Sequence, residues 1–537
     1  MILILVVSSC SNDKTASPSA ALPTANAGAL KAHIEFLAHD LLEGRDTGSR
    51  GYDIAAQYVV SHFRQYGLTP AGDNGSYLQN VTFRQRLLNM SKTSLTLHED
   101  TDYSFSLPEQ FVTSGSSASQ FESITAPLVF VGYGISAPHL DYDDYANIDV
   151  TNKIVVLLNE KPANLPSEEA AHFASRHQRA LAAAKHGAIG MIYLQTPQSE
   201  KRYAFARMKA QVARPAYTWL NQQNEPGNWI KGMKAGALLS QDAAARLLQS
   251  APHQFSDLVA KSENQDPLPH FDLGTSATIQ VGSDHRTISS PNVVGYVEGS
   301  DPELKNEYIV YSAHLDHIGI HSDHDGADAI NNGAMDNASG TAIMLETARL
   351  FAENPPKRSV LFIAVTGEEK GLQGSDYFAQ NPTVPVEQLV ANINLDMPLI
   401  LYPIGDVIAF GAEHSTLGRS VQNAAEKVGL QLSPDPMPQQ NIFVRSDHYS
   451  FVKQGVPAVF LVPGFKSLDE SIDGGKIFQQ FFVDHYHQPS DQADLNIDYE
   501  AGTRFTEVNY LIGVEIANSE RRPQWLEGDF FGDTFGR

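Results

Sequence analysis

From residue 292 onward, the chain alternates apolar, strand-like segments with segments of helical pattern. Three of the apolar segments, 308–313, 359–365 and 390–395, have the length and composition of strands. Helical patterns at 338–351 and 416–428 fall among them. Strands that alternate with helices in this way predict an α/β fold.

Two further regions precede this one. Residues 30–66 carry apolar positions at three- and four-residue spacing, which predicts helices on either side of a Gly-rich turn. Strand and helix patterns alternate again in 125–284, so we expect a smaller α/β domain inserted there. The flanking segments 30–124 and 285–537 then form one larger domain.

The first ten residues are mainly apolar and end at Cys10. This run is too short to span a bilayer, and residues 7–10 resemble the lipobox of bacterial lipoproteins. We therefore expect residues 1–10 to be a lipoprotein signal peptide and 11–29 a flexible tether. Lipidated Cys10 would attach an exported bacterial protein to the cell envelope, and Ser11 favours the outer membrane. The alternative is an N-terminal strand with an inert cysteine.

Length and charge narrow the class of protein. A chain of 537 residues is long enough for two or three domains. Its 62 acidic residues exceed its 38 basic residues, and the formal charge of −24 argues against nucleic acid as a partner. The single cysteine excludes an intramolecular disulfide and a cysteine-based zinc site.

Metal-type ligands follow the three apolar segments. His314 comes directly after the first, Glu369 lies shortly after the second, and Asp396 follows the third. Two further candidates are Asp336, in a Gly-rich stretch, and His487, near the C-terminus. The ligand crevice of an open α/β sheet lies at the carboxyl ends of its strands, so we expect these side chains to meet. Imidazoles and carboxylates in this number suit two zinc ions that share one carboxylate.

Each of these signals has an ordinary structural explanation when it is taken alone. An aspartate before a helix, such as Asp336, is usually an N-cap, and a pair such as Glu368 and Glu369 is usually a solvated surface. Their joint occurrence at strand ends favours a metal site. Glu368 would then act as general base on a bound water, and Asp316 would orient the ring of His314.

The loop between the first two ligands is crowded with histidines and aspartates. They are His317, His321, Asp323, His324, Asp325 and Asp328. We interpret this segment as a solvated acidic loop near the crevice, with an additional metal site as the alternative.

The order of these motifs resembles the dinuclear zinc exopeptidases, which include secreted bacterial leucyl aminopeptidases and glutamate carboxypeptidase. The motifs are His-x-Asp at 314–316, Gly-Ala-x-Asp-Asn-Ala-Ser-Gly at 333–340, Glu-Glu-x-Gly-Leu-x-Gly-Ser at 368–375, Asn-x-Asp-Met at 394–397, Arg-Ser-Asp-His at 445–448 and Tyr-His at 486–487. The resemblance implies a mostly parallel central sheet flanked by helices. Segment 125–284 resembles the protease-associated domain that some members carry as an insert.

The same resemblance implies the ligand set. One zinc ion would take Asp336, Glu369 and His487. The other would take His314, Asp336 and Asp396, so that Asp336 bridges the two ions.

Further roles are implied for residues around the two ions. Glu368 would be the general base, Tyr486 would stabilise the oxyanion, and Arg445 would contact the carbonyl of the substrate. The peptide bond Asp336–Asn337 would be cis.

We therefore expect a zinc aminopeptidase, in which a water that bridges the metals attacks the first bond of a peptide with a free N-terminus. A carboxypeptidase is the main alternative on the same site, and a glutaminyl cyclase uses an overlapping ligand set. A receptor-like protein without activity is the alternative from a different class. The oligomeric state stays open, with a homodimer among the options.

Overall fold

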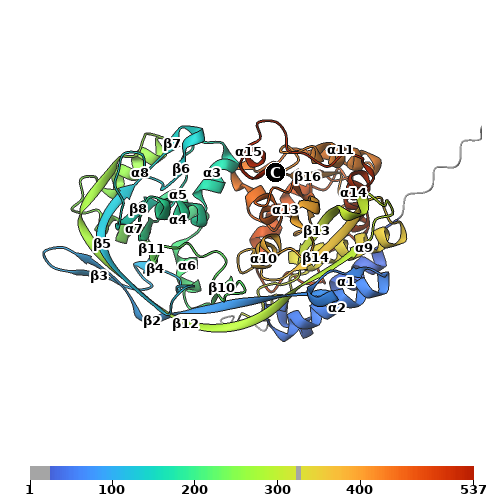
Figure 1. The fold of residues 1–537 in the computed structure, drawn as a ribbon, viewed down its shortest axis with the longest axis horizontal. Helices are drawn as coiled ribbons and strands as arrows, with labels where there is room; N and C mark the ends of the chain where they lie inside the picture. The colour runs from blue at the N-terminus through green and yellow to red at the C-terminus, as the bar shows by residue number, and fades with distance from the viewer. Residues whose placement is uncertain (1–23, 322–327) are drawn as a thin grey trace, which may run out of the picture.

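A computed structural model describes residues 24–321 and 328–537. Two lobes are joined by a pair of long antiparallel strands (Figure 1). The predictions for the signal peptide, for Cys10 and for residues 11–23 of the tether lie outside the described residues. Within those two ranges, no helix has the length and apolar character needed to cross a membrane.

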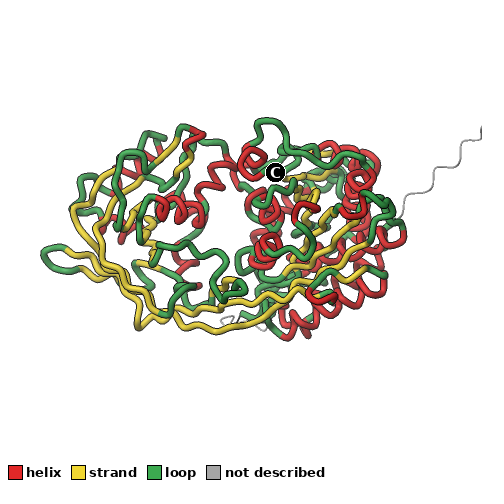
Figure 2. Tube along the Cα trace, viewed as in Figure 1, coloured by secondary structure: helices red, strands yellow, loops and turns green. Residues whose placement is uncertain are grey.

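Helices surround the strands of the large lobe (Figure 2). Its central sheet has the strand order β17-β16-β18-β15-β13-β14-β12. The four strands β18, β15, β13 and β14 run parallel, whereas β16 and β12 are antiparallel to their inner neighbours. The bounds are β12 His270–Val297, β13 Tyr308–His314, β14 Ser359–Val365, β15 Leu389–Asn394, β16 Asp406–Phe410, β17 Gln431–Ser433 and β18 Ala458–Pro463.

Helices cover both faces of this sheet. Along β13, Ile309 and Tyr311 face one core, while Val310 between them faces the other. A strand buried on both faces is apolar along its whole length, which explains the unbroken apolar runs. The first core includes α1 Ala27–Leu37, α2 Arg50–Tyr66, α9 Ser339–Glu353, α11 Leu417–Lys427, α13 Gly474–Asp484 and α14 Tyr499–Asn518, and the second includes α10 Gln373–Gln380 and α12 His448–Val452.

The small lobe has a parallel sheet and a core of its own. Its strands are β4 Phe111–Val112, β5 Phe121–Val131, β8 Ile154–Leu158, β9 Gly190–Leu194 and β11 Ala235–Leu239. The last four run parallel to one another, and β4 pairs antiparallel with β11. Its helices are α3 Ser167–Ala174, α4 Arg176–Lys185, α5 Pro197–Arg202, α6 Phe205–Gln211, α7 Gln241–Leu247 and α8 Phe255–Glu263.

Short strands and one short helix complete the two lobes. They are β1 Thr69–Pro70, β3 Tyr103–Phe105, β6 Ser136–Ala137, β7 Tyr142–Asp143, β10 Ala216–Trp219 and α15 Phe530–Phe535.

The strands β2 (Leu78–His98) and β12 run along both lobes. Leu78 pairs with Val293 at one end of this ribbon, and His98 pairs with Ser276 at the other. β12 also pairs with β5 in the small lobe and with β14 in the large lobe. The boundaries expected at 124/125 and 284/285 fall inside β5, which packs in the small lobe, and inside β12, which continues from the core of the small lobe to that of the large lobe.

Candidate metal centre

The predicted ligands come from adjacent ends of the central sheet. His314 is the last residue of β13, Asp396 lies two residues after β15, and Glu369 lies four residues after β14. Asp336 is in the turn Ala334–Ala338 that leads into α9, and His487 follows α13. Because β13, β14 and β15 are parallel neighbours, their carboxyl ends open on the same edge of the sheet.

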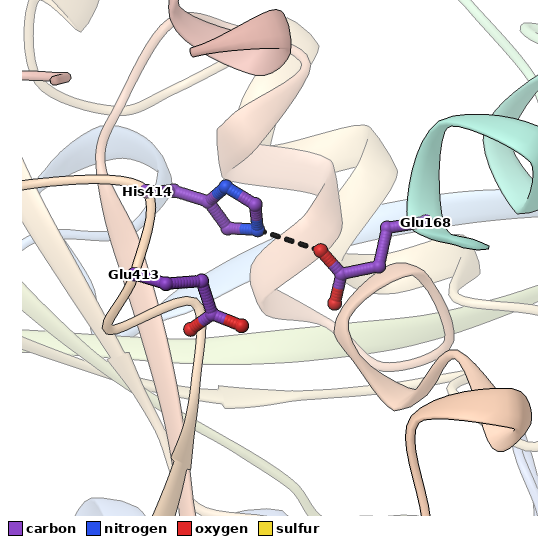
Figure 3. A group of neighbouring side chains, drawn as sticks. All are labelled: Glu168, Glu413 and His414. Atoms are coloured by element: carbon purple, nitrogen blue, oxygen red, sulfur yellow. Dashed lines mark hydrogen bonds and ion pairs between the residues drawn. The ribbon is translucent and has the colours of Figure 1, made fainter. Parts of the chain in front are cut away.

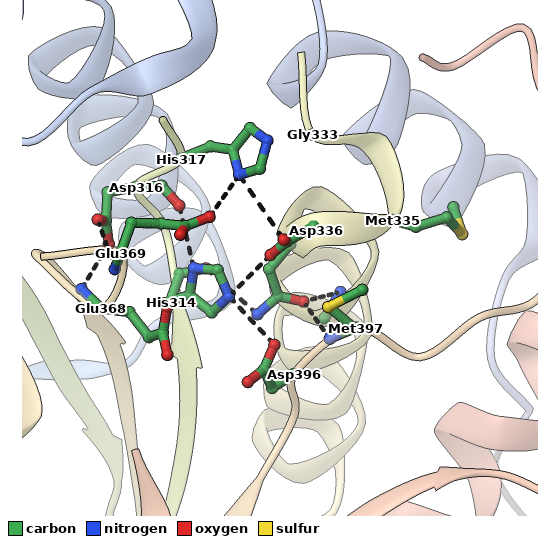
Figure 4. A network of polar contacts seen from close by, with 12 residues as sticks. His314, Asp316, His317, Gly333, Met335, Asp336, Glu368, Glu369, Asp396 and Met397 are labelled. Atoms are coloured by element: carbon green, nitrogen blue, oxygen red, sulfur yellow. Dashed lines mark hydrogen bonds and ion pairs between the residues drawn. The ribbon is translucent and has the colours of Figure 1, made fainter. Parts of the chain in front are cut away.

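Two groups of side chains share Asp336. Figure 4 shows His314 and Asp396 of the first group and Glu369 of the second. In the first group, His314 Nε2 lies 3.3 Å from Asp336 Oδ1 and 3.1 Å from Asp396 Oδ1. In the second group, His487 Nε2 lies 3.2 Å from Asp336 Oδ2 and 3.2 Å from Glu369 Oε2. The carboxylate of Asp336 therefore presents one oxygen to each group.

These spacings fit bound zinc. A tetrahedral zinc ion with bonds of about 2.0–2.1 Å places its ligand atoms roughly 3.3 Å apart. The four nitrogen–oxygen distances above, 3.1 to 3.3 Å, agree with that value. The five side chains are between 1% and 21% exposed, and buried carboxylates of this number require positive charge beside them.

Hydrogen bonds to Asp491 hold the backbone of the turn that carries Asp336. This buried carboxylate accepts the N–H groups of Met335, at 2.9 Å, and of Asp336, at 3.0 Å. Burial raises the pKa of Asp491 to about 6. The peptide bond Asp336–Asn337 is cis, as the family resemblance implied. Asp491 was not among the predicted site residues, and its sequence signal is its place four residues after His487.

Arg45 is a second buried group for which the sequence predicted no role. Its guanidinium donates to the carbonyl oxygens of Leu315, at 3.0 Å, Asn332, at 2.6 Å, and Gly333, at 3.2 Å. These carbonyls belong to the two segments that carry His314 and Asp336. Burial lowers the pKa of Arg45 to about 10, although Asp491 and other nearby carboxylates act in the opposite direction.

Asp316 has a different role from the one predicted. The ring of His314 contacts the main-chain oxygen of Asp316, with Nδ1 at 3.0 Å, and not its carboxylate. The carboxylate instead accepts the N–H groups of Glu368 and Glu369, at 3.1 and 3.3 Å, and the hydroxyl of Thr47 at 3.0 Å. The start of the Glu368–Glu369 loop offers two N–H donors, which draw the carboxylate away from the imidazole.

Glu368 lies beside His314 (Figure 4). Burial raises its pKa well above the ordinary value, and the carboxylates of Asp396 and Glu369 act in the same direction, against the charge of His314. This loop therefore places a carboxyl group next to both ligand groups without making it part of either.

Tyr486 packs against a predicted ligand, whereas Arg445 lies on the surface. The ring of Tyr486 stacks on that of His487, with centroids 3.9 Å apart, and burial raises its pKa. Arg445 is exposed, and its guanidinium donates to the carbonyl oxygen of Gln440 at 3.4 Å. The neighbouring Ser446, which the sequence analysis did not assign to the site, donates to Asp396 Oδ2 at 2.6 Å. It orients that carboxylate.

The prediction of a solvated loop is wrong for His317, which is fully buried. Its Nδ1 lies 2.7 Å from Glu369 Oε1 (Figure 4). Asp323, His324 and Asp325 lie outside the described residues.

A second histidine–carboxylate cluster joins the two lobes (Figure 3). His414, after β16, contacts Glu168 of α3 with Nε2 at 2.7 Å and Asp529, before α15, with Nδ1 at 2.6 Å. Burial alone would lower the pKa of His414, but its bonds to Asp529 and Glu168 outweigh that effect and raise it to about 10. Glu413 lies in the same cluster.

Comparison with known proteins identifies the segment that carries the ligands. Residues 292–512 match the sequence model described as Peptidase family M28, which confirms the predicted resemblance for this segment. A protein of Pyrenophora teres f. teres (strain 0-1) named a probable zinc metalloprotease is 39% identical over 120 residues, 22% of this chain and 25% of that protein. Aminopeptidase YwaD of Bacillus subtilis (strain 168) is 25% identical over 250 residues, 44% of this chain and 47% of that protein. The chain thus matches less than half the length of each relative.

The fold also has a solved counterpart. The structure of an aminopeptidase from Aneurinibacillus sp. strain AM-1 superposes with a TM-score of 0.51 at 19% sequence identity. The superposition covers 93% of this chain and 96% of that chain. It confirms the predicted fold class, an α/β protein with a mostly parallel central sheet flanked by helices.

Proposed function

We propose that this chain, whose residues 292–512 match Peptidase family M28, is an aminopeptidase that binds two zinc ions. The observation that carries the proposal is the shared carboxylate of Asp336, which lies 3.2–3.3 Å from a histidine of each ligand group. One ion would bind to His314, Asp336 and Asp396, and the other to Asp336, Glu369 and His487.

Each part of the reaction has a residue suited to it. Two bound zinc ions would supply a Lewis acid for the scissile carbonyl and lower the pKa of the attacking water. Glu368 would accept a proton from the attacking water and pass it to the leaving amine. Tyr486, whose ring stacks on that of His487, would donate a hydrogen bond from its hydroxyl to the developing oxyanion. The raised pKa of this hydroxyl keeps its proton in place for that contact.

Surrounding groups hold the ligands in position. Ser446 fixes Asp396, and the carboxylate of Asp316 fixes the backbone of Glu368 and Glu369. Asp491 fixes the backbone of Asp336. Ligand orientation by hydrogen bonds of this kind is a general requirement of metal sites.

The same centre would serve a carboxypeptidase or a glutaminyl cyclase. The name of the Bacillus subtilis relative and that of the superposed structure favour an aminopeptidase. The presence of both complete ligand groups argues against a receptor-like protein without activity. Substrates distinguish these alternatives directly.

The first experiment measures release of free amino acids from a panel of leucyl peptides, each with a free or an acetylated N-terminus. We expect activity only on free N-termini, loss after chelation, and recovery on addition of zinc. Glu368→Gln should lower kcat by about 10²- to 10⁴-fold with an unchanged zinc content, because it removes the general base. Glu413→Gln, in the cluster between the lobes, is the matched control and should keep full activity.

Other outcomes would correct the proposal in specific ways. Release of C-terminal residues from acetylated peptides would indicate a carboxypeptidase. Two bound zinc ions without turnover of any peptide would leave the metal centre in place and refute the substrate class. A protein that binds no zinc would refute both.

A further inference from the structure

Backbone contacts to other segments fix His317 beside the second ligand group. Its backbone N–H donates to the carbonyl oxygen of Arg45 at 3.3 Å, and His317 forms a β-bridge with Asp46. The preceding segment is held as well, because Arg45 donates to the carbonyl oxygen of Leu315 at 3.0 Å. The place of His317 is therefore determined by buried contacts to the N-terminal part of the chain.

The ring of His317 lies in a narrow slot. Gly333 has a φ of +59°, and a Cβ atom there would lie only 2.6 and 2.7 Å from the ring atoms Cδ2 and Cγ of His317. On another side, the ring of His487 meets it edge-on, with centroids 5.7 Å apart and planes at 71°. The ring cannot turn away from Glu369 without displacing these neighbours.

The distances distinguish a hydrogen bond from metal ligation. His317 Nδ1 lies 2.7 Å from Glu369 Oε1 but 3.9 Å from Asp336 Oδ2. A charge-assisted N–H···O bond spans about 2.7–2.9 Å, whereas two ligands of one tetrahedral zinc ion lie roughly 3.3 Å apart. His487 meets both Asp336 and Glu369 at 3.2 Å, which fits a ligand. His317 lies at hydrogen-bond distance from Glu369 and, at 3.9 Å, only at the outer limit of an ion pair from Asp336.

The two oxygens of Glu369 are thus divided between two histidines. Oε2 faces His487, a predicted ligand, and Oε1 faces His317. We propose that His317 is a positioning residue whose Nδ1–H holds Glu369 Oε1, so that Oε2 points to the ion shared with Asp336 and His487. This inference rests on the proposed function, because it assigns a role within the same metal centre.

A pair of variants tests the role of the donor. His317→Leu removes the N–H, whereas His317→Asn keeps an N–H close to the place of Nδ1, and the two side chains branch at the same atom. The dissociation constants of the two zinc ions are measured for each protein by competition with a chromophoric chelator. Circular dichroism and thermal unfolding establish that both variants fold.

We expect one of the two zinc ions to bind about 10- to 100-fold more weakly to His317→Leu, because loss of an outer hydrogen bond to a ligand has an effect of that size. The other ion should bind as in the wild type. His317→Asn should recover most of the lost affinity. A purely structural role of the ring would weaken both variants alike and would not single out one ion.

Three results would overturn the inference. They are unchanged zinc affinities in His317→Leu, equal losses in the folded Leu and Asn variants, and evidence that His317 itself binds the metal. The last is tested without a destabilising change, by ¹⁵N NMR of the zinc-loaded wild type with labelled histidine, assigned with His317→Asn. A proton on Nδ1 of His317 supports donation, and its absence would overturn it, whether Nδ1 binds the metal or the proton lies on Nε2. A wild-type protein that binds fewer than two zinc ions would instead refute the proposed function.

Discussion

The molecule contains two clusters of histidines and carboxylates that differ in the distances between their nitrogen and oxygen atoms. At the sheet edge, His314 and His487 lie 3.1–3.3 Å from the carboxylate oxygens around them. Between the lobes, His414 lies 2.6 and 2.7 Å from Asp529 and Glu168. The first spacing is that of two ligands of one metal ion, and the second is that of a hydrogen bond.

The difference follows from how each cluster is built. The predicted ligands at the sheet edge lie at the ends of parallel strands and in turns, whose backbone N–H groups donate hydrogen bonds to groups such as Asp316 and Asp491. His414 lies instead in a contact between a helix of the small lobe and the C-terminal segment of the large lobe. Residue types alone therefore do not identify a metal site, whereas their spacing does. By this criterion, the bond between His317 and Glu369 belongs with the contacts of His414.

The largest effect is expected from Asp336→Asn. Replacing one oxygen of the shared carboxylate removes a ligand from one ion and the bridging charge from both. Zinc retained after dialysis should fall from two ions per chain to below one, with activity below detection, as measured by elemental analysis and peptide hydrolysis. The control Asp529→Asn breaks a bond of His414 and should keep both ions. Loss of zinc from the control would show that the two clusters are not independent.

A smaller effect is expected from His414→Gln. Loss of its bonds to Glu168 and Asp529 should lower the free energy of unfolding by about 1.5–3 kcal/mol at pH 6.5, a typical range for hydrogen bonds to charged groups. Thermal unfolding of the zinc-loaded proteins measures this difference. A midpoint equal to that of the wild type would mean that the contact between the lobes does not contribute to stability.

The same variant gives a pH dependence with a defined sign. The folded protein raises the pKa of His414 from 6.5 to about 10, so its contribution to stability is complete below pH 6.5 and declines as the pH rises toward 10. The thermal midpoint of the wild type should therefore approach that of His414→Gln between pH 7 and pH 10. A constant difference across this range would contradict the charged state of His414.

The smallest effect is expected from Glu413→Gln. Glu413 is exposed and lies beside His414, as a metal ligand would. Since the His414 nitrogens already bond to two other carboxylates, we expect no change in zinc content and a stability change within about 0.5 kcal/mol. A wild type with three zinc ions per chain and a variant with two would show that this cluster binds metal after all.

Much of the fold, and the meeting of the predicted ligands at one edge of the sheet, could be predicted from the sequence. The apolar runs ending at His314 and just before Asp396 are β13 and β15, and the helices predicted at 338–351 and 416–428 are α9 and α11. Parallel strands place their carboxyl ends together, so a ligand at the end of each strand already implies a shared site. The motifs also indicated the family whose sequence model matches residues 292–512, since the predicted ligands follow in the order expected for that family.

Only the tertiary structure decided which residues position the predicted ligands through hydrogen bonds. Asp491 bonds to the backbone of Asp336 across 155 residues of sequence, and His317 bonds to Glu369 across 52. The carboxylate of Asp316 turns to two backbone N–H groups that lie 52 and 53 residues away. Strand ends are encoded by local patterns of apolar residues, but a contact within 3 Å depends on how distant loops pack. A local pattern in the sequence does not contain that information.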